Sequence, residues 1–213
     1  MLAIAGGKGG CGKTTTALGL AGALARDGEC PLVVEADCDM PNLHTMAETD
    51  RSPGVGAVAD GDSIAVATHR SPVVPGVDVL PAGGASGPIR GTALRRLARA
   101  RQRVILDCPA GATDWAAAPL RHADGVVVVS TGERASLADA AKTARMAETL
   151  DARVLGSVLT CVDDPPSAVT GSLAPELEPI LATVPEIAGD VLGDRVGRTS
   201  YDRLAAALAR RNV

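Results

Sequence analysis

A glycine-rich loop near the start of the chain constrains the fold more than any other stretch. It fits the pattern G-x-x-x-x-G-K-[ST] of phosphate-binding loops and reads Gly7-Lys8-Gly9-Gly10-Cys11-Gly12-Lys13-Thr14. The apolar residues 2–5 before it predict a short buried strand, and residues 14–26 after it predict a helix. Strand, loop and helix in this order are the context that such a loop requires, so we expect an α/β fold.

The residue types of this loop also predict its chemistry. Glycines let backbone N–H groups turn toward an anion, and the N-terminus of the following helix adds a partial positive charge. Lys13 can then reach the β- and γ-phosphates of a nucleotide, and the Thr14 hydroxyl can ligate Mg²⁺. We therefore predict that the loop from Gly7 to Thr15 binds ATP or ADP together with Mg²⁺.

A second motif follows at a distance that suits the first. It is an apolar strand that ends in an acid and then a turn, Val104-Ile105-Leu106-Asp107-Cys108-Pro109-Ala110-Gly111. An acid in this position is the Walker B pattern, in which the carboxylate helps to hold Mg²⁺. Asp107 is therefore our second predicted metal residue.

The phosphate-binding loop contains a second lysine, Lys8, although the chain has only three lysines in all, the third being Lys142. The string K-G-G-x-G-K-T-T resembles the deviant Walker A box of the MinD/ParA family of ATPases, and the Asp107 motif is similar to the family's second switch. The resemblance spans essentially the whole chain. It implies a three-layer P-loop NTPase with a mostly parallel sheet flanked by helices, and an ATP-bound homodimer in which Lys8 reaches the partner subunit's phosphates.

The same resemblance implies roles for two acids after the next apolar run. Counted without gaps from Lys13, the family's first-switch acids fall on Glu35 and Asp37, and its Asn-Leu pair falls on residues 42–43. Asp37 would orient the attacking water, and Glu35 would hold waters on Mg²⁺. The family usually has Asp where Glu35 stands, and Asp39 offers an alternative pair, Asp37 with Asp39.

The rest of the chain alternates between apolar runs and amphipathic stretches, which predicts one P-loop domain over residues 1–213. The further strands are expected at 31–37, 64–67, 77–83, 104–107, 124–130, 152–160 and 180–184, and the further helices at 91–101, 133–150 and 199–211. The chain contains no Phe, so Ala, Val and Leu must form most of the core. The absence of a leader or long apolar segment predicts a cytoplasmic protein.

The predicted helix 91–101 is rich in arginine, which leaves two interpretations open. Arg95, Arg99 and Arg103 follow each other at a spacing of four residues and could form a basic face for DNA phosphates. We favour a solvated face, because the chain uses arginine in place of lysine and its formal net charge is −4. The C-terminal stretch lacks the bulky apolar residues of a membrane-docking helix, so none is expected there.

Five cysteines are present, and none forms a C-x-x-C pair; they are Cys11, Cys30, Cys38, Cys108 and Cys161. We interpret them as small, buried, reduced thiols. The alternative is a redox-sensitive site or a cluster held between subunits, as in iron–sulfur carrier relatives of the family. The cysteine positions of those relatives do not match the ones found here.

The resemblance thus implies an ATP-dependent dimerisation switch for intracellular positioning or partitioning, with slow hydrolysis stimulated by a protein activator or cargo. Two other readings stay open. One is a metabolic ligase on the same fold, which would need a substrate pocket beside the γ-phosphate. The other is a nucleotide-binding scaffold that has lost hydrolysis, which the presence of Glu35 would allow.

Overall fold

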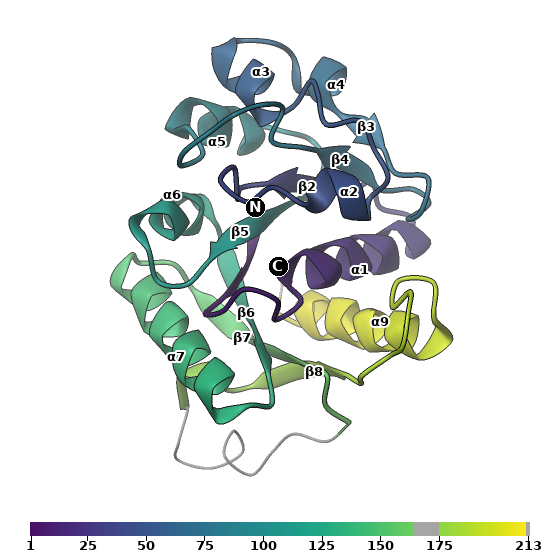
Figure 1. The fold of residues 1–213 in the computed structure, drawn as a ribbon, viewed down its shortest axis with the longest axis vertical. Coiled ribbons are helices and arrows are strands. Elements are labelled where there is room, and N and C mark those ends of the chain that lie inside the picture. Colours follow the sequence, from purple (N-terminus) through teal and green to yellow (C-terminus); the bar gives the residue numbers. More distant parts are fainter. Residues whose placement is uncertain (164–174, 212–213) are drawn as a thin grey trace.

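A computed structural model describes residues 1–163 and 175–211 and shows a parallel sheet between two layers of helices (Figure 1). The strand order is β3-β4-β2-β5-β1-β6-β7-β8, and every neighbouring pair is parallel except β3 with β4. The strands are β1 (Leu2–Gly6), β2 (Leu32–Glu35), β3 (His69–Arg70), β4 (Asp78–Leu80), β5 (Val104–Ala110), β6 (Gly125–Thr131), β7 (Val154–Thr160) and β8 (Ile180–Val184).

Helices connect most consecutive parallel strands and cover the two faces of the sheet, as strand–helix–strand units require. They are α1 (Lys13–Arg26), α2 (Leu43–Met46), α3 (Val55–Asp60), α4 (Ile64–Ala67), α5 (Gly91–Leu97), α6 (Asp114–His122), α7 (Arg134–Thr149), the 3₁₀ turn η1 (Pro175–Leu177) and α9 (Arg195–Ala209). Helices α1 and α9 lie on one face, and α5, α6 and α7 lie on the other (Figure 1). The predicted fold class is confirmed.

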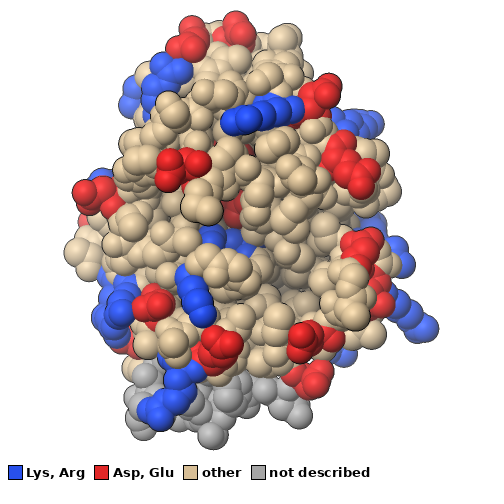
Figure 2. All heavy atoms as spheres, in the orientation of Figure 1, with Lys and Arg blue, Asp and Glu red and all other residues tan. Residues whose placement is uncertain are grey.

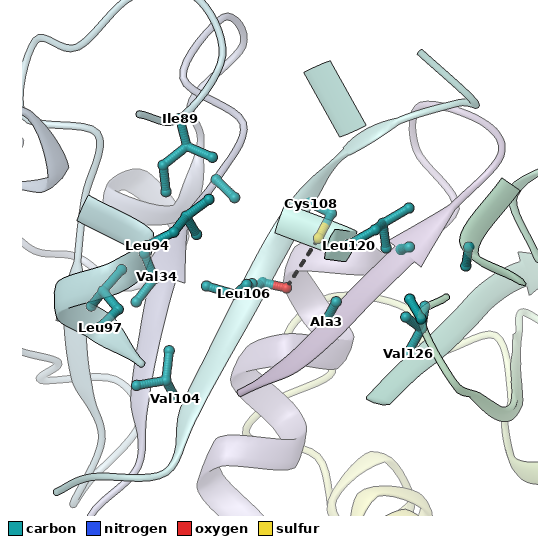
Figure 3. Close-up of a cluster of buried hydrophobic side chains, with 14 of the residues drawn as sticks. Ala3, Val34, Ile89, Leu94, Leu97, Val104, Leu106, Cys108, Leu120 and Val126 are labelled. Carbon is teal, nitrogen blue, oxygen red and sulfur yellow. Dashed lines mark hydrogen bonds between the residues drawn. The ribbon is translucent and has the colours of Figure 1, made fainter. Parts of the chain in front are cut away.

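Two apolar layers hold these helices to the sheet. On the face of α5, α6 and α7, side chains such as Leu94, Leu106 and Leu120 pack together, and the Cys108 thiol donates to the Leu106 carbonyl at 3.6 Å (Figure 3). On the opposite face, the largest fully buried side chain is Tyr201 of α9, which packs against α1. Small aliphatic residues fill most of both layers, as the composition predicts.

Several elements differ from their predicted form or bounds. Helix α5 ends at Leu97, four residues before the expected end at 101, and β4 is shorter than the expected strand 77–83. Residues 64–67 were predicted as an edge strand but form the short helix α4, because the Ser63 hydroxyl accepts the Val66 N–H at 3.3 Å and caps its first turn. The edge strand is instead β3, antiparallel to β4. The last helix starts at Arg195, four residues earlier than expected, because the Asp194 carboxylate caps its first turn.

Candidate nucleotide-binding site

A cavity of about 330 Å³ lies at the carboxyl ends of β1, β2 and β5. Ligands of parallel α/β sheets bind at this edge, since loops from several strands converge there. The cavity gathers predicted site residues from three separate parts of the sequence. Its lining is Gly9, Gly10, Gly12, Lys13, Thr14, Thr15, Asp37, Met40, Asn42, Met46, Asp107, Cys108 and Ala110.

The glycine-rich loop is held from behind by two neighbouring elements. A Cβ on Gly7 would lie 2.1 Å from the Asp139 backbone of α7, so only glycine allows this approach. On the other side, the Thr160 hydroxyl at the end of β7 donates to the Cys11 carbonyl at 2.9 Å. Gly12 has a φ of 86° and directs the chain into α1. The loop is therefore shaped before any ligand binds, which favours phosphate binding.

The two lysines of the loop have different surroundings. Lys13 is 9% exposed, lines the cavity, and places its Nζ 3.5 Å from the carbonyl oxygen of Lys8. The Lys8 side chain is 54% exposed and does not line the cavity; its Nζ lies 3.5 Å from a Glu133 carboxylate oxygen. Only Lys13 is thus placed to bind phosphates in its own cavity.

The residues after β2 close one side of the cavity. Asp37 lines it, and one of its carboxylate oxygens accepts the Met40 N–H at 3.1 Å. The Thr14 hydroxyl lies 3.0 Å from the side-chain oxygen of Asn42 and joins this segment to the phosphate-binding loop. Asp39 is exposed and lies outside this cavity. Of the two alternative acid pairs, the structure therefore brings Asp37 alone into contact with the cavity.

Glu35 and Asp107 lie side by side at facing register positions of β2 and β5, and Asp107 lines the cavity. Burial and the neighbouring Asp107 carboxylate raise the pKa of Glu35. Burial raises the pKa of Asp107 too, although the Thr14 hydroxyl and the Lys13 ammonium partly offset this. Two adjacent buried acids of this kind need a proton or a cation to be stable.

The donor set fits a magnesium ion bound mainly through phosphates and water. One carboxylate oxygen of Glu35 and one of Asp107 are buried without a hydrogen-bond partner, beside the Thr14 hydroxyl. Within residues 1–163 and 175–211, no three or more His, Cys, Asp or Glu side chains are grouped so as to hold a metal by themselves. Mg²⁺ commonly keeps several waters and binds one or two carboxylates with substrate phosphates, which matches this arrangement.

A second cavity of about 270 Å³ adjoins the first and shares Asp37, Met40 and Ala110 with it. Asp39, Pro109, Thr113 and Trp115 complete its lining. Neither Met40, which is 77% exposed, nor Trp115 was predicted from the sequence to lie at the site. The available signal in the sequence was the large side chain of Met40 next to Asp37 and Asp39. This signal does not indicate a cavity unless one knows how the loops after β2 and β5 approach each other.

The cysteines only partly match their interpretation as buried thiols. Cys11, Cys38 and Cys108 are buried, and burial raises the pKa of each thiol, to about 12 for Cys38. These thiols are neutral at pH 7 and poor nucleophiles. Cys30 and Cys161 are exposed, contrary to that interpretation, and all five cysteines are free of disulfides.

A parallel sheet with a glycine-rich loop between β1 and α1, and with an acid ending the adjacent β5, defines a P-loop nucleotide-binding protein. The chain belongs to the CobQ/CobB/MinD/ParA nucleotide binding domain family, whose model matches residues 2–198.

Three similar proteins illustrate the range of this family. An uncharacterised ATP-binding protein of Methanocaldococcus jannaschii is 33% identical over 197 residues, which cover 87% of this chain and 74% of that protein. The septum site-determining protein MinD of Pyrococcus horikoshii, solved with Mg-ADP, superimposes with a TM-score of 0.82 at 22% identity, over 99% of this chain and 96% of that chain. Cobyrinic acid a,c-diamide synthase of Mycobacterium smegmatis, solved with an ATP analogue and magnesium, gives a TM-score of 0.76 at 23% identity, over 99% and 94%. The two structural likenesses concern the fold.

In the described part of the chain, no helix combines the length and apolar character that crossing a membrane requires. The two leucines of α9, Leu204 and Leu208, are buried in the core, whereas Val196 in its first turn is 55% exposed.

Proposed function

We propose that this protein binds ATP with Mg²⁺ and acts as an ATP-dependent dimerisation switch in intracellular positioning or partitioning. The observation that carries the proposal is the position of Lys8. Lys8 belongs to the phosphate-binding loop but does not line the cavity of its own subunit, and it is half-exposed. By leaving its exposed partner Glu133, it can reach the phosphates of a second subunit. The proposal also draws on the resemblance of the loop to the MinD/ParA box.

The chain's own residues divide the work of hydrolysis. Lys13 and the N–H groups of the loop bind the phosphates, and Thr14, Glu35 and Asp107 hold Mg²⁺ and its waters. Magnesium neutralises the charge that develops on the phosphates. Asp37 lines the cavity and orients the attacking water. Hydrolysis is slow until a protein activator or cargo binds, and it releases the dimer. The five free cysteines fit a reducing cytoplasm.

Asp37→Ala tests this switch directly. Without the water-orienting carboxylate, the variant should bind Mg-ATP, stop before hydrolysis and accumulate as a dimer. Light scattering should then show the 21.4 kDa chain at twice its mass with Mg-ATP and at its single mass with Mg-ADP. Single-turnover phosphate release should be lost in the variant but present in the parent. Identical masses with both nucleotides would contradict the dimerisation switch.

A second candidate is an ATP-dependent ligase. The adjoining cavity of about 270 Å³ favours it, since a ligase needs room for a substrate beside the γ-phosphate and the two cavities share Asp37. The cobyrinic acid synthase shows that the fold also carries such chemistry. A ligase would not need a lysine from a second subunit, so ATP turnover retained in a monomeric Lys8→Ala variant would favour this candidate over the switch.

A further inference from the structure

The Glu35 carboxylate makes a contact that its predicted metal role does not require. It accepts the Leu43 N–H at 2.7 Å through Oε2, and this N–H belongs to the first residue of α2. Both residues are fully buried. The bond closes a loop over residues 36–42, which include Asp37 and Asn42, so one side chain fixes the far end of the segment that lines the cavity.

The other oxygen of the same carboxylate, Oε1, is buried without a hydrogen-bond partner, as is Oδ1 of Asp107 on the neighbouring strand. Leaving a buried carboxylate oxygen without a donor is costly. A metal-bound water could supply that donor to Oε1 while Oε2 keeps the Leu43 N–H. The Thr14 hydroxyl, 3.0 Å from Asn42, links the same segment to the phosphate-binding loop.

We propose that Glu35 is a positioning residue that couples Mg²⁺ at the nucleotide site to the conformation of residues 36–43. One carboxylate oxygen holds the start of α2, and the other binds the hydrated metal. Aspartate is shorter by one C–C bond, about 1.5 Å, and cannot serve both ends. Glutamate at this position is therefore the residue that this loop needs. The inference rests on the metal and nucleotide part of the proposed function, and not on dimerisation.

Amide hydrogen exchange at Leu43 tests the coupling, with ADP present so that the chain stays monomeric. In the parent, adding Mg²⁺ to the ADP-bound protein should slow the exchange of the Leu43 amide. In Glu35→Gln the amide oxygen still accepts the N–H, so exchange without Mg²⁺ should match the parent, but the effect of Mg²⁺ should disappear. In Glu35→Asp the contact is lost, and exchange without Mg²⁺ should rise about tenfold or more.

Two controls separate this effect from general instability. Glu48→Gln makes the same chemical change at an exposed residue just after α2 and should behave as the parent. The Val158 amide in the middle of β7 should exchange equally in every variant that is folded. Equal Leu43 exchange in Glu35→Asp and the parent would overturn the contact. A retained Mg²⁺ effect in Glu35→Gln would overturn the coupling.

Failure of Mg-ADP to bind to the parent at all would instead count against the nucleotide-binding proposal. The comparison of Glu35→Asp with the parent in the absence of metal would still test whether Glu35 holds α2. Calorimetric titration of Mg²⁺ into the ADP complexes provides a second measurement, and both Glu35 variants should bind the metal more weakly than Glu48→Gln.

Discussion

Lys8 and Lys13 are five residues apart in one loop, yet they differ in exposure and partners. Lys13 is buried at the cavity, whereas Lys8 extends to Glu133 at the start of α7. The ion pair between Lys8 and Glu133 is exposed, and exposed pairs contribute little to stability. The proposed contact of Lys8 with the phosphates of a second subunit would therefore cost little in stability when it replaces this ion pair.

Lys8→Ala should consequently separate nucleotide binding from dimerisation. We expect the variant to bind Mg-ATP with an affinity within a few-fold of the parent, because Lys8 does not line its own cavity. Light scattering with Mg-ATP should show monomer only, also when the change is combined with Asp37→Ala. Lys142→Ala removes the third lysine, which lies exposed on α7, and should dimerise normally. An ATP-dependent dimer of Lys8→Ala would refute the role of Lys8 in the partner subunit.

Single residues were predictable where a contiguous motif names them. Lys13, Thr14 and Asp107 could be assigned to the cavity from the sequence because their motifs carry their own chemistry. The contacts of Glu35 with Leu43 and of Thr14 with Asn42 could not. In each of these two contacts, the distance between the residues depends on how the loop after β2 folds back. Counting residues along the sequence does not show how that loop folds.

At the scale of the elements, helices α1 and α9 pack closely against each other at a glycine of α1. A Cβ on Gly19 of α1 would lie 2.3 to 2.6 Å from ring atoms of Tyr201, which is 1% exposed. The contact joins the helix that follows the phosphate-binding loop to the last helix of the chain. It therefore supports the orientation of α1, and with it the position of the site.

Gly19→Ala should destabilise the protein although alanine favours helices. The gain in helix propensity is about 1 kcal/mol, whereas overpacking a buried contact costs about 1–3 kcal/mol. Urea denaturation should show a net loss of about 1 kcal/mol. Tyr201→Leu removes the ring, so adding Gly19→Ala to that variant should be neutral or stabilising. Stabilisation by Gly19→Ala in the parent would show that the ring moves aside freely.

The elements that were predicted well are the buried ones. The apolar runs of strands that are covered on both faces are recognisable in the sequence. The first residues of β1, β5, β6 and β7 were therefore predicted to within two residues. The short stretch 64–67 was misassigned because four apolar residues suit either a strand or one turn of helix. The cap from Ser63 decides between them, and Val66 remains 69% exposed.

At the scale of the whole molecule, charge is dispersed. Figure 2 shows acidic and basic side chains interspersed over one face. The alternative basic face of Arg95, Arg99 and Arg103 is also divided, because α5 ends at Leu97 and Arg103 lies beyond it, paired with Glu29 at 2.7 Å. Arg96 donates to two backbone carbonyls, and Arg90 pairs with Asp60. These arginines act within the chain, which favours the solvated-face interpretation.

DNA binding by the ATP-bound Asp37→Ala protein should therefore be weak. Among the described arginines of residues 90–103, the side chains of Arg95, Arg99 and Arg101 have no hydrogen bond or ion pair within the chain. Three phosphate contacts give a salt slope of about −3 per subunit at most. Co-sedimentation with DNA, measured at low and at physiological salt, should show little DNA binding at physiological salt. Changing Arg95 and Arg99 together to Glu should not alter DNA binding at physiological salt. Tight DNA binding by the parent that is lost in this double variant would instead establish a DNA site.

The overall arrangement could be predicted because alternating strands and helices, with right-handed crossovers, leave few sheet orders open. The cavity beside the nucleotide site could not be predicted. It forms where the loops after β2 and β5 meet, and the motifs of these loops contain no information on how closely the two loops approach each other.

That meeting place also contains the single tryptophan of a chain without phenylalanine. Trp115 is partly exposed beside Asp37 and Met40, while the only tyrosine is enclosed between α1 and α9. Indole emission from the unmodified protein therefore originates from one known location, next to the loops that would contact the γ-phosphate. The molecule carries its own optical probe, and stopped-flow fluorescence can follow these loops in real time without a label.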